Sequence, residues 1–154
     1  MNIKKYSSSQ EKLLAALKKS GMRMTPQRLA ICKYMAVTEA HPTAADVYRQ
    51  LKPQFPSLSL MTVYNTLNAL VGMGAVNALG MAGDDNVHYD GDTSPHVNLI
   101  CLNCHRISDM DSNLVEKLDA EICDSSGFKV IGSRLVYYGL CPECQKSQNK
   151  KGEK

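Results

Sequence analysis

Four successive segments in the first half of the chain place apolar residues with the period of an α-helix. The first follows Ser8, which precedes Glu11 by three residues as in a capping box, and Gly21 marks its end. In the second, Thr25 stands before Pro26, a pair typical of the first helical turn. The last two segments also begin at hydroxyl residues, and they predict helices from residue 43 to the proline at 53 and over residues 59–72.

The pattern changes after the glycines at positions 72 and 74. Residues 75–79 and 86–90 resemble two short strands on either side of a turn at residues 80–85, which predicts a β-hairpin. Three helices followed by a hairpin is the element order of a winged helix-turn-helix. The pattern therefore predicts such a domain over residues 1–91, with one additional helix at its N-terminus.

A second set of elements follows. Residues 96–101 and 107–110 are predicted strands, and Leu114, Leu118 and Ile122 give an amphipathic helix that ends at Gly127. Another strand is expected over residues 130–140. The predicted fold class is α+β, with a C-terminal α/β domain over residues 92–144 and a disordered tail over residues 145–154.

Four of the six cysteines form two CxxC pairs. They are Cys101 with Cys104 and Cys141 with Cys144, and a predicted strand–helix–strand segment separates them. A CxxC turn directs both sulfur atoms at one ion, and a second turn completes a tetrahedron. Since no coordination position stays open, the pattern predicts a structural Zn²⁺ ion, not a catalytic one.

Two disulfides or a redox dithiol are the competing interpretations. Disulfides need an oxidising compartment, but residues 1–10 have no apolar stretch typical of a secretory signal, so a cytoplasmic location is expected. A redox CxxC motif would begin a helix, whereas Cys144 is expected to lead into the polar tail. The other two cysteines, Cys32 and Cys123, are predicted to be small buried apolar residues.

Chain length and net charge exclude few classes of binding partner. The chain has 154 residues, a formal net charge of +3 and a pI near 8.5, and it has no tryptophan. This mildly basic balance is compatible with nucleic acid without being diagnostic of it. No apolar run is long enough to span a membrane. Each domain is small, so a zinc ion or a partner subunit is expected to stabilise it.

The fourth predicted helix has an unusual polar face. Opposite its apolar stripe it carries amide and hydroxyl groups, where a solvated face usually carries lysine and glutamate. Such groups suit base edges and phosphates in a DNA groove, although a loop-facing helix with ordinary polar residues explains them equally well. Candidate DNA-contacting residues are Thr62, Tyr64, Asn65 and Asn68, with Arg28 and the nearby Lys18, Lys19 and Arg23 as phosphate contacts.

Four segments together resemble the ferric uptake regulator family. They are HPTAADVY at residues 41–48, TVYNTL at 62–67, HVNLICLNC at 96–104 and CPEC at 141–144. The resemblance covers nearly the whole chain. It implies a homodimeric, metal-dependent bacterial transcriptional repressor with an N-terminal winged helix that binds double-stranded operator DNA, expected to be palindromic. It also implies that the C-terminal α/β domain is the dimerisation domain and holds the structural zinc.

Besides the paired cysteines, several histidines and aspartates remain as candidate metal ligands, although each one alone is more often an ordinary surface or capping residue. The resemblance places His41, Asp90, His96 and Asp109 on the family's regulatory-metal positions, where Fe²⁺ or Mn²⁺ suits a mixed imidazole and carboxylate site. The sequence departs from the family at Asn98, where a second histidine is usual. Either Asn98 coordinates through its amide oxygen, or water or His88 replaces it.

Two features resemble the peroxide-sensing branch of the family, namely aspartate at position 109, where iron- and zinc-sensing members have glutamate, and the HPTA run at residues 41–44. The implied mechanism is peroxide oxidation of a metal-binding histidine, loss of metal and release of DNA. This is stoichiometric self-oxidation, so no enzyme is expected. The alternatives are an iron- or zinc-homeostasis repressor of the same family and, in another class, a CxxC thiol oxidoreductase. A zinc hydrolase is disfavoured because the chain has no open zinc motif.

Overall fold

A computed structural model describes residues 3–130 and 133–149 of the chain. The chain divides into two compact units. The first contains residues 1–80 and 86–93, and the second contains residues 81–85 and 94–154. Residues 81–85, which make up most of the hairpin turn expected at residues 80–85 of the N-terminal domain, are thus grouped with the second unit. One reason is that the carbonyl oxygen of Ala82 lies 2.8 Å from Nδ1 of His105.

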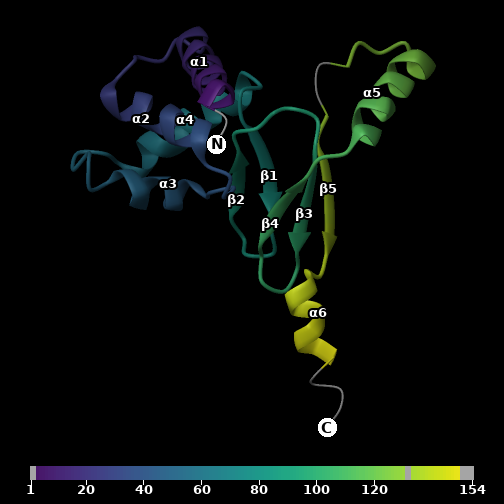
Figure 1. The fold of residues 1–154 in the computed structure, drawn as a ribbon. Helices are drawn as coiled ribbons and strands as arrows, with labels where there is room; N and C mark the ends of the chain where they lie inside the picture. Colours follow the sequence, from purple (N-terminus) through teal and green to yellow (C-terminus); the bar gives the residue numbers. More distant parts are fainter. Residues whose placement is uncertain (1–2, 131–132, 150–154) are drawn as a thin grey trace. The chain divides into compact units, whose positions relative to one another are not determined.

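The first unit is a bundle of helices followed by a β-hairpin, as predicted (Figure 1). Its elements in chain order are α1 (Ile3–Lys19), α2 (Pro26–Val37), α3 (Ala44–Leu51), α4 (Leu60–Gly72), β1 (Asn77–Met81) and β2 (Val87–Asp90). Strands β1 and β2 form a two-stranded sheet. This order is that of a winged helix-turn-helix.

Three of the helices begin at the predicted capping residues. Thr25, Thr43 and Ser59 each accept a hydrogen bond from a backbone N–H in the first turn, and at Thr43 the carboxylate of Asp46 completes a capping box. The start predicted for α1 was wrong, because the helix begins at Ile3 and passes through Ser8. No glycine or proline lies between these two positions, so nothing in the chain interrupts the helix there.

The core of the first unit comes from one stripe of each helix. Its largest fully buried side chains include Leu13 and Leu17 of α1, Ile31 and Met35 of α2, Val47 of α3, and Val63, Leu67 and Leu70 of α4. Two apolar residues of these helices lie outside the buried stripes, because Leu29 is 37% exposed and Leu60 is 39% exposed. Residues 31, 32 and 35 provide the buried face of α2 instead, and the thiol of Cys32 is fully buried as predicted.

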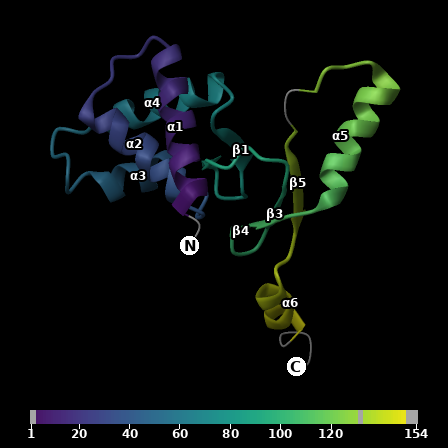
Figure 2. The same ribbon diagram turned by 45° about the horizontal axis from the view of Figure 1, so that its top comes forward.

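The second unit contains a three-stranded sheet with order β4-β3-β5. Its elements are β3 (Val97–Cys101), β4 (Ile107–Met110), α5 (Asn113–Ser126), β5 (Leu135–Gly139) and α6 (Pro142–Asn149). Strand β3 pairs antiparallel with β4 and parallel with β5, and α5 lies in the connection between β4 and β5 (Figures 1 and 2). Gly127, in the left-handed region at φ 72°, ends α5 as predicted.

Two predictions for the C-terminal region need correction. The strand expected over residues 130–140 is only β5, and residues 131–132 lie outside the described part of the chain. Residues 145–149 are not a disordered tail, because they belong to α6, whose turns are closed by a bond from Gln145 N–H to Cys141 O at 3.0 Å. Residues 150–154 lie outside the described residues. Within the described ranges, no helix has the length and apolarity needed to cross a bilayer.

Candidate metal centres and nucleic-acid interface

The four paired cysteines converge at one end of the second unit. Cys101 ends β3, Cys104 lies in the turn that follows, and Cys141 and Cys144 flank the start of α6. Parallel pairing of β3 with β5 aligns Cys101 with Gly139, which brings the second pair next to the first. All four sulfur atoms lie within 4.8 Å of one another.

The spacing of the sulfur atoms fits a tetrahedral metal site. Cys104 Sγ and Cys141 Sγ are 3.8 Å apart, and all four cysteines are free thiols. Zn–S bonds of about 2.3 Å in a tetrahedron place sulfur atoms about 3.8 Å apart, whereas a disulfide requires about 2.05 Å. The cluster therefore has the geometry of a four-thiolate zinc site.

One argument against a redox dithiol was wrong. Cys144 does not lead into a tail, because Pro142, Glu143 and Cys144 form the first turn of α6, and the second CxxC pair therefore begins a helix. What separates the cluster from a redox dithiol is instead the presence of the other pair. A thiol pair with two further thiols within 4.8 Å offers a complete donor set for one ion.

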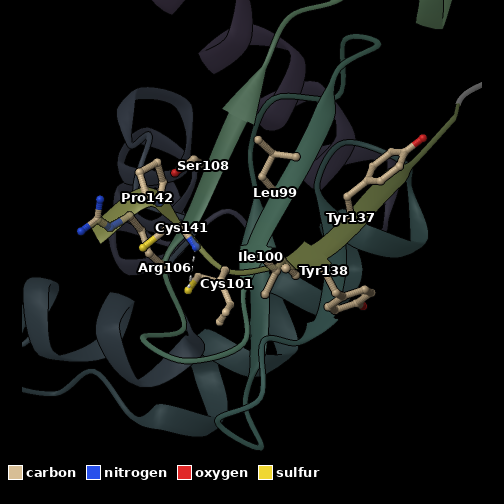
Figure 3. Close-up of a pocket in the computed structure, with 11 residues that line it drawn as sticks. Leu99, Ile100, Cys101, Arg106, Ser108, Tyr137, Tyr138, Cys141 and Pro142 are labelled. Atoms are coloured by element: carbon tan, nitrogen blue, oxygen red, sulfur yellow. Dashed lines mark hydrogen bonds between the residues drawn. The ribbon is translucent and has the colours of Figure 1, made fainter. Parts of the chain in front are cut away.

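Hydrogen bonds around the sulfur atoms give Cys101 and Cys141 different thiol pKa values. The backbone N–H groups of Cys141 and Cys104 lower the pKa of Cys101 to about 6, and the Cys141 contact is 3.3 Å long (Figure 3). At Cys141 the backbone N–H of Cys144 lowers the pKa, but burial and the side chains of Glu143, Cys144 and Cys101 together raise it to about 12. A divalent cation bound by the cluster would hold Cys141 as a thiolate at neutral pH despite this raised pKa.

Polar side chains join the two CxxC turns, and the sequence analysis missed them. The side-chain N–H of Asn103 donates to Cys144 Sγ at 3.1 Å, and the Arg106 guanidinium lies 3.2 Å from the Glu143 carboxylate. Each pair is separated by about forty positions in the chain, so no local pattern could reveal it. These contacts hold the turns together and orient the sulfur atoms.

A pocket of about 320 Å³ lies beside the cysteine cluster on the sheet of the second unit (Figure 3). Leu99 of β3 and Tyr137 and Tyr138 of β5 line it, and they are 39%, 60% and 56% exposed. Cys101 and Cys141 also line it, together with Arg106 and Pro142. The pocket thus joins an exposed apolar sheet surface to the candidate zinc site.

In the first unit, His41 and Asp90 form a buried pair. His41 Nε2 lies 4.0 Å from Asp90 Oδ1, and the two side chains are 2% and 4% exposed. An imidazole and a carboxylate buried together at this distance offer two ligands of the kind that Fe²⁺ and Mn²⁺ accept. The Asp90 carboxylate also accepts the backbone N–H of Asp92 at 2.8 Å, which fixes its orientation.

His88 supports the loop that carries His41. The His41 backbone has φ 48°, a left-handed conformation that is uncommon for a residue other than glycine. His88 Nδ1 lies 2.8 Å from the carbonyl oxygen of His41, so the ring donates Nδ1–H to that oxygen. Pro42 O accepts the backbone N–H of Tyr89 at 3.0 Å. His88, an alternative ligand in the sequence analysis, thus makes a contact that positions His41.

In the second unit, His96, Asn98 and Asp109 lie together. The antiparallel register pairs Asn98 on β3 with Asp109 on β4. His96 Nε2 lies 3.1 Å from Asn98 Nδ2 and 3.7 Å from Asp109 Oδ1. His96 and Asn98 are buried, whereas the Asp109 side chain is 37% exposed. Each unit therefore carries a histidine beside an aspartate, and the second adds the amide of Asn98.

The polar face of α4 is exposed over most of its length. Asn65 and Asn68 are exposed, and Tyr64 is 39% exposed. Thr62 is half-buried, and its hydroxyl lies 2.8 Å from the Ser59 hydroxyl, so it also takes part in capping the helix. The opposite face is anchored in the core. The helix can therefore present amide and phenol groups to a partner without loss of packing.

The basic candidates near α2 differ in their surroundings. The Arg28 guanidinium is half-buried and donates to the carbonyl oxygen of Arg23 at 2.8 Å, which stabilises the turn before α2. Lys18, Lys19 and Arg23 are exposed.

Cys123 was wrongly predicted to be buried, because it lies on α5 and is only half-buried. Its helix has an exposed apolar stripe of Leu114, Leu118 and Ile122.

Comparisons with known proteins agree with one another. The sequence profile of the Ferric uptake regulator family matches residues 19–138. The chain is 41% identical to the "Peroxide operon regulator" of Bacillus subtilis over 136 residues, which covers 88% of this chain and 93% of that protein. It is 36% identical to the "Peroxide-responsive repressor PerR" of Staphylococcus aureus, covering 94% of this chain and 97% of that one.

Solved structures show the same likeness. A structure of PerR from Streptococcus pyogenes, whose subject is peroxide sensing and gene regulation, is 38% identical and has a TM-score of 0.50, covering 89% of this chain and 93% of that one. The Pseudomonas aeruginosa ferric uptake regulator with manganese is 26% identical and has a TM-score of 0.69, covering 83% of this chain and 96% of that one.

Proposed function

Because the chain belongs to the ferric uptake regulator family, we propose that it is a metal-dependent transcriptional repressor that releases operator DNA in response to hydrogen peroxide. The observation that carries the proposal is the pair of His96 and Asp109, 3.7 Å apart, in a chain 41% identical to a peroxide operon regulator. An aspartate at this position is what the resemblance associates with the peroxide-sensing branch.

The DNA-binding element is α4. Its exposed residues Tyr64, Asn65 and Asn68 suit the donors and acceptors of a major groove, and Asn can pair with adenine through two hydrogen bonds. Thr62 lies on the same face, and Arg28, Lys18, Lys19 and Arg23 are proposed phosphate contacts. The operator is double-stranded, and a two-fold dimer would read it as a palindrome. Such a repressor acts in the cytoplasm, where chromosomal DNA is accessible.

Structural zinc is held by Cys101, Cys104, Cys141 and Cys144. Four thiolates leave no coordination position open, so this ion fixes the second unit and takes no part in chemistry. The contacts of Asn103 and Arg106 across the two turns support this role. Because the ion ties the end of β3 to the start of α6, metal binding and folding of this unit are coupled.

The regulatory metal, Fe²⁺ or Mn²⁺, takes His41 and Asp90 from one unit and His96 and Asp109 from the other. The support for this set is that each pair already lies together within its own unit and consists of imidazole and carboxylate. An ion bound by both pairs favours the conformation that binds DNA, so metal and DNA strengthen each other's binding. His88 is proposed to position His41 through its bond to the His41 carbonyl oxygen.

When bound, Fe²⁺ would supply the redox chemistry that cleaves the O–O bond of hydrogen peroxide. His41 and His96 are the oxidisable imidazoles: one peroxide oxygen would add at a ring C–H bond of either residue, the other would leave as water, and the oxidised ring would be a weaker ligand. The pair that contains the altered ring then no longer holds the ion, and DNA affinity falls. Mn²⁺ supports the same conformation without this reaction. Since each molecule is consumed by its own oxidation, the protein is not proposed to be an enzyme.

A second copy of the chain is the partner of the second unit. Leu99, Tyr137 and Tyr138 expose apolar surface on the sheet, and α5 exposes a stripe that includes Leu114 and Leu118. Strand β5 is at the edge of the sheet, where its outer backbone groups are available for pairing. Exposed apolar surfaces of this kind typically mark sites of contact with another protein chain.

The experiment that tests the proposal is operator binding by the zinc-containing protein, measured with no added metal, Fe²⁺, Mn²⁺ or Zn²⁺, before and after peroxide. A peroxide sensor binds DNA with Fe²⁺ and with Mn²⁺, and peroxide abolishes binding of the Fe²⁺ form alone. An iron-homeostasis repressor would keep DNA binding after peroxide, and a zinc-homeostasis repressor would respond to Zn²⁺ in preference to the other ions.

A further inference from the structure

Asn98 is a buried polar residue beside a proposed metal-binding nitrogen. Its side chain is 1% exposed on β3, and Nδ2 lies 3.1 Å from His96 Nε2. Its other polar atom, Oδ1, is buried and has no hydrogen-bond partner within the described structure. The only bond recorded for this amide within the described residues is therefore the one to His96.

The hydrogen bond made by Nδ1 of His96 determines whether Nε2 donates to Asn98 or accepts from it. His96 Nδ1 lies 2.8 Å from the carbonyl oxygen of Ser94. A carbonyl oxygen only accepts, so Nδ1 carries the proton and donates it. In the neutral imidazole, which is the form that binds metal, Nε2 then carries the lone pair. Asn98 must present its NH₂ group to that lone pair, which agrees with the orientation of its amide.

We propose that Asn98 competes with the regulatory metal for the Nε2 lone pair of His96. This inference rests on the proposed function, since it assumes that His96 is a ligand of the sensor ion. One lone pair cannot accept a hydrogen bond and bind a cation at the same time. Metal binding therefore breaks the Asn98 contact, and metal loss restores it.

The competition has a consequence for the sensor. When the ion is absent, Asn98 donates a hydrogen bond to a buried imidazole nitrogen, and this bond stabilises the metal-free form. The asparagine thus raises the metal concentration at which the repressor becomes active. Asp109 does not share this role, because a carboxylate has no proton to donate to Nε2 when it is ionised.

Replacing the amide by an apolar group of similar shape tests the proposal. In Asn98→Leu the donor is lost, and Mn²⁺ affinity is expected to rise about two- to tenfold, the range that one net hydrogen bond supplies. Free Mn²⁺ is measured by electron paramagnetic resonance in the zinc-containing protein. Asn113→Leu, the same change at an exposed position on α5, should leave the affinity unchanged. Circular dichroism and zinc content establish that both variants are folded.

Two results separate this inference from the proposed function. If His96→Ala leaves Mn²⁺ affinity unchanged, His96 is not a ligand, and both the sensor site and the competition are wrong. If His96→Ala weakens binding and Asn98→Leu weakens it too, His96 is a ligand but Asn98 is a ligand as well, and only the competition is overturned.

The parent protein provides a test that needs no folded variant of Asn98. Long-range ¹H–¹⁵N spectra of the zinc-containing protein without regulatory metal distinguish the two histidine tautomers, with His96→Ala used for assignment. The competition predicts a neutral His96 with its proton on Nδ1 and an unprotonated Nε2. A proton on Nε2 would mean that the Asn98 amide accepts there, and would overturn the proposal.

Discussion

Asn98 on β3 and Asp109 on β4 are paired directly across the antiparallel part of the sheet. The pairing brings an amide to 3.1 Å and a carboxylate to 3.7 Å from the same nitrogen of His96. This strand register therefore places two residues beside the proposed ligand His96. They are Asp109, which suggests peroxide sensing, and Asn98, which departs from the family. A shift of one residue would move Asp109 to the opposite face of the sheet.

Replacing Asn98 with histidine should tighten Mn²⁺ binding more than replacing it with leucine does. Histidine removes the competing N–H and adds an imidazole, which is a stronger ligand than an amide oxygen. The measurement is operator binding during a Mn²⁺ titration. Half-saturation of Asn98→His at the same Mn²⁺ concentration as the parent would show that position 98 does not face the ion.

Loss of His88 should weaken the regulatory site by releasing the His41 loop. In His88→Ala the bond to the His41 carbonyl is removed, and Mn²⁺ affinity is expected to fall about two- to tenfold, the effect of one net hydrogen bond. Val87→Ala, at an exposed neighbouring position on β2, is the control. Equal affinity in His88→Ala and the control would contradict the positioning role.

A single substitution in the cysteine cluster should remove zinc and unfold the second unit. In Cys101→Ser the ion loses a thiolate, and structural zinc contributes on the order of 10 kcal/mol in small domains. Zinc content, circular dichroism and dimer formation are the measurements. Cys123→Ser, outside the cluster, should keep all three. A zinc-free Cys101→Ser protein that is still folded and dimeric would contradict the assignment.

Substitution of Asn65 should abolish specific DNA binding without affecting metal content. The side chain is exposed on α4, and loss of a good base contact costs about 1–3 kcal/mol per half-site, which is doubled in a symmetric dimer. Operator binding of Asn65→Ala and Tyr64→Ala is compared with that of Asn113→Ala. If the two α4 variants bind like the control, α4 is not the recognition helix.

The capping box of α3 should give the first unit a pH-dependent contribution to stability. Burial raises the pKa of Asp46, but its hydrogen bonds to Thr43 and its contact with Arg49 lower the pKa by more, so the net shift is downward. A lowered folded-state pKa stabilises the fold above the unfolded value, near 3.9, and this stabilisation is lost as the pH falls through the folded value. Urea unfolding should therefore distinguish Asp46→Asn from the parent at pH 7, and the difference should begin to decrease near pH 4 and disappear once the pH is below the folded-state pKa. A difference between Asp46→Asn and the parent that is the same at pH 7 and in acid would contradict this prediction.

The sequence predicted the elements that have local signals. Thr25, Thr43 and Ser59 each begin a helix, because a capping hydroxyl acts within its own first turn. The start of α1 and the helix α6 were missed because neither has such a local signal. No capping hydroxyl marks the first turn of α1, and the polar sequence of α6 carries no apolar period.

The candidate site was predictable in its ligand types but not in its supporting contacts. Histidine, aspartate and paired cysteines can be recognised in the sequence by their chemistry and spacing. The bond from His88 to His41 and the bond from Asn103 to Cys144 join residues 47 and 41 positions apart. Only the folded chain brings such residues together, so their roles could not be inferred from local pattern.

The central claim is that peroxide acts on the metal-binding histidines. Its most direct test is peptide mass mapping of the Fe²⁺ and Mn²⁺ forms after peroxide, with Asp109→Glu treated in parallel. The account predicts the mass of one added oxygen on the peptide containing His41 or His96 in the Fe²⁺ form, little in Asp109→Glu and none with Mn²⁺. Unmodified His41 and His96 in an Fe²⁺ protein that has nevertheless released its DNA would contradict it.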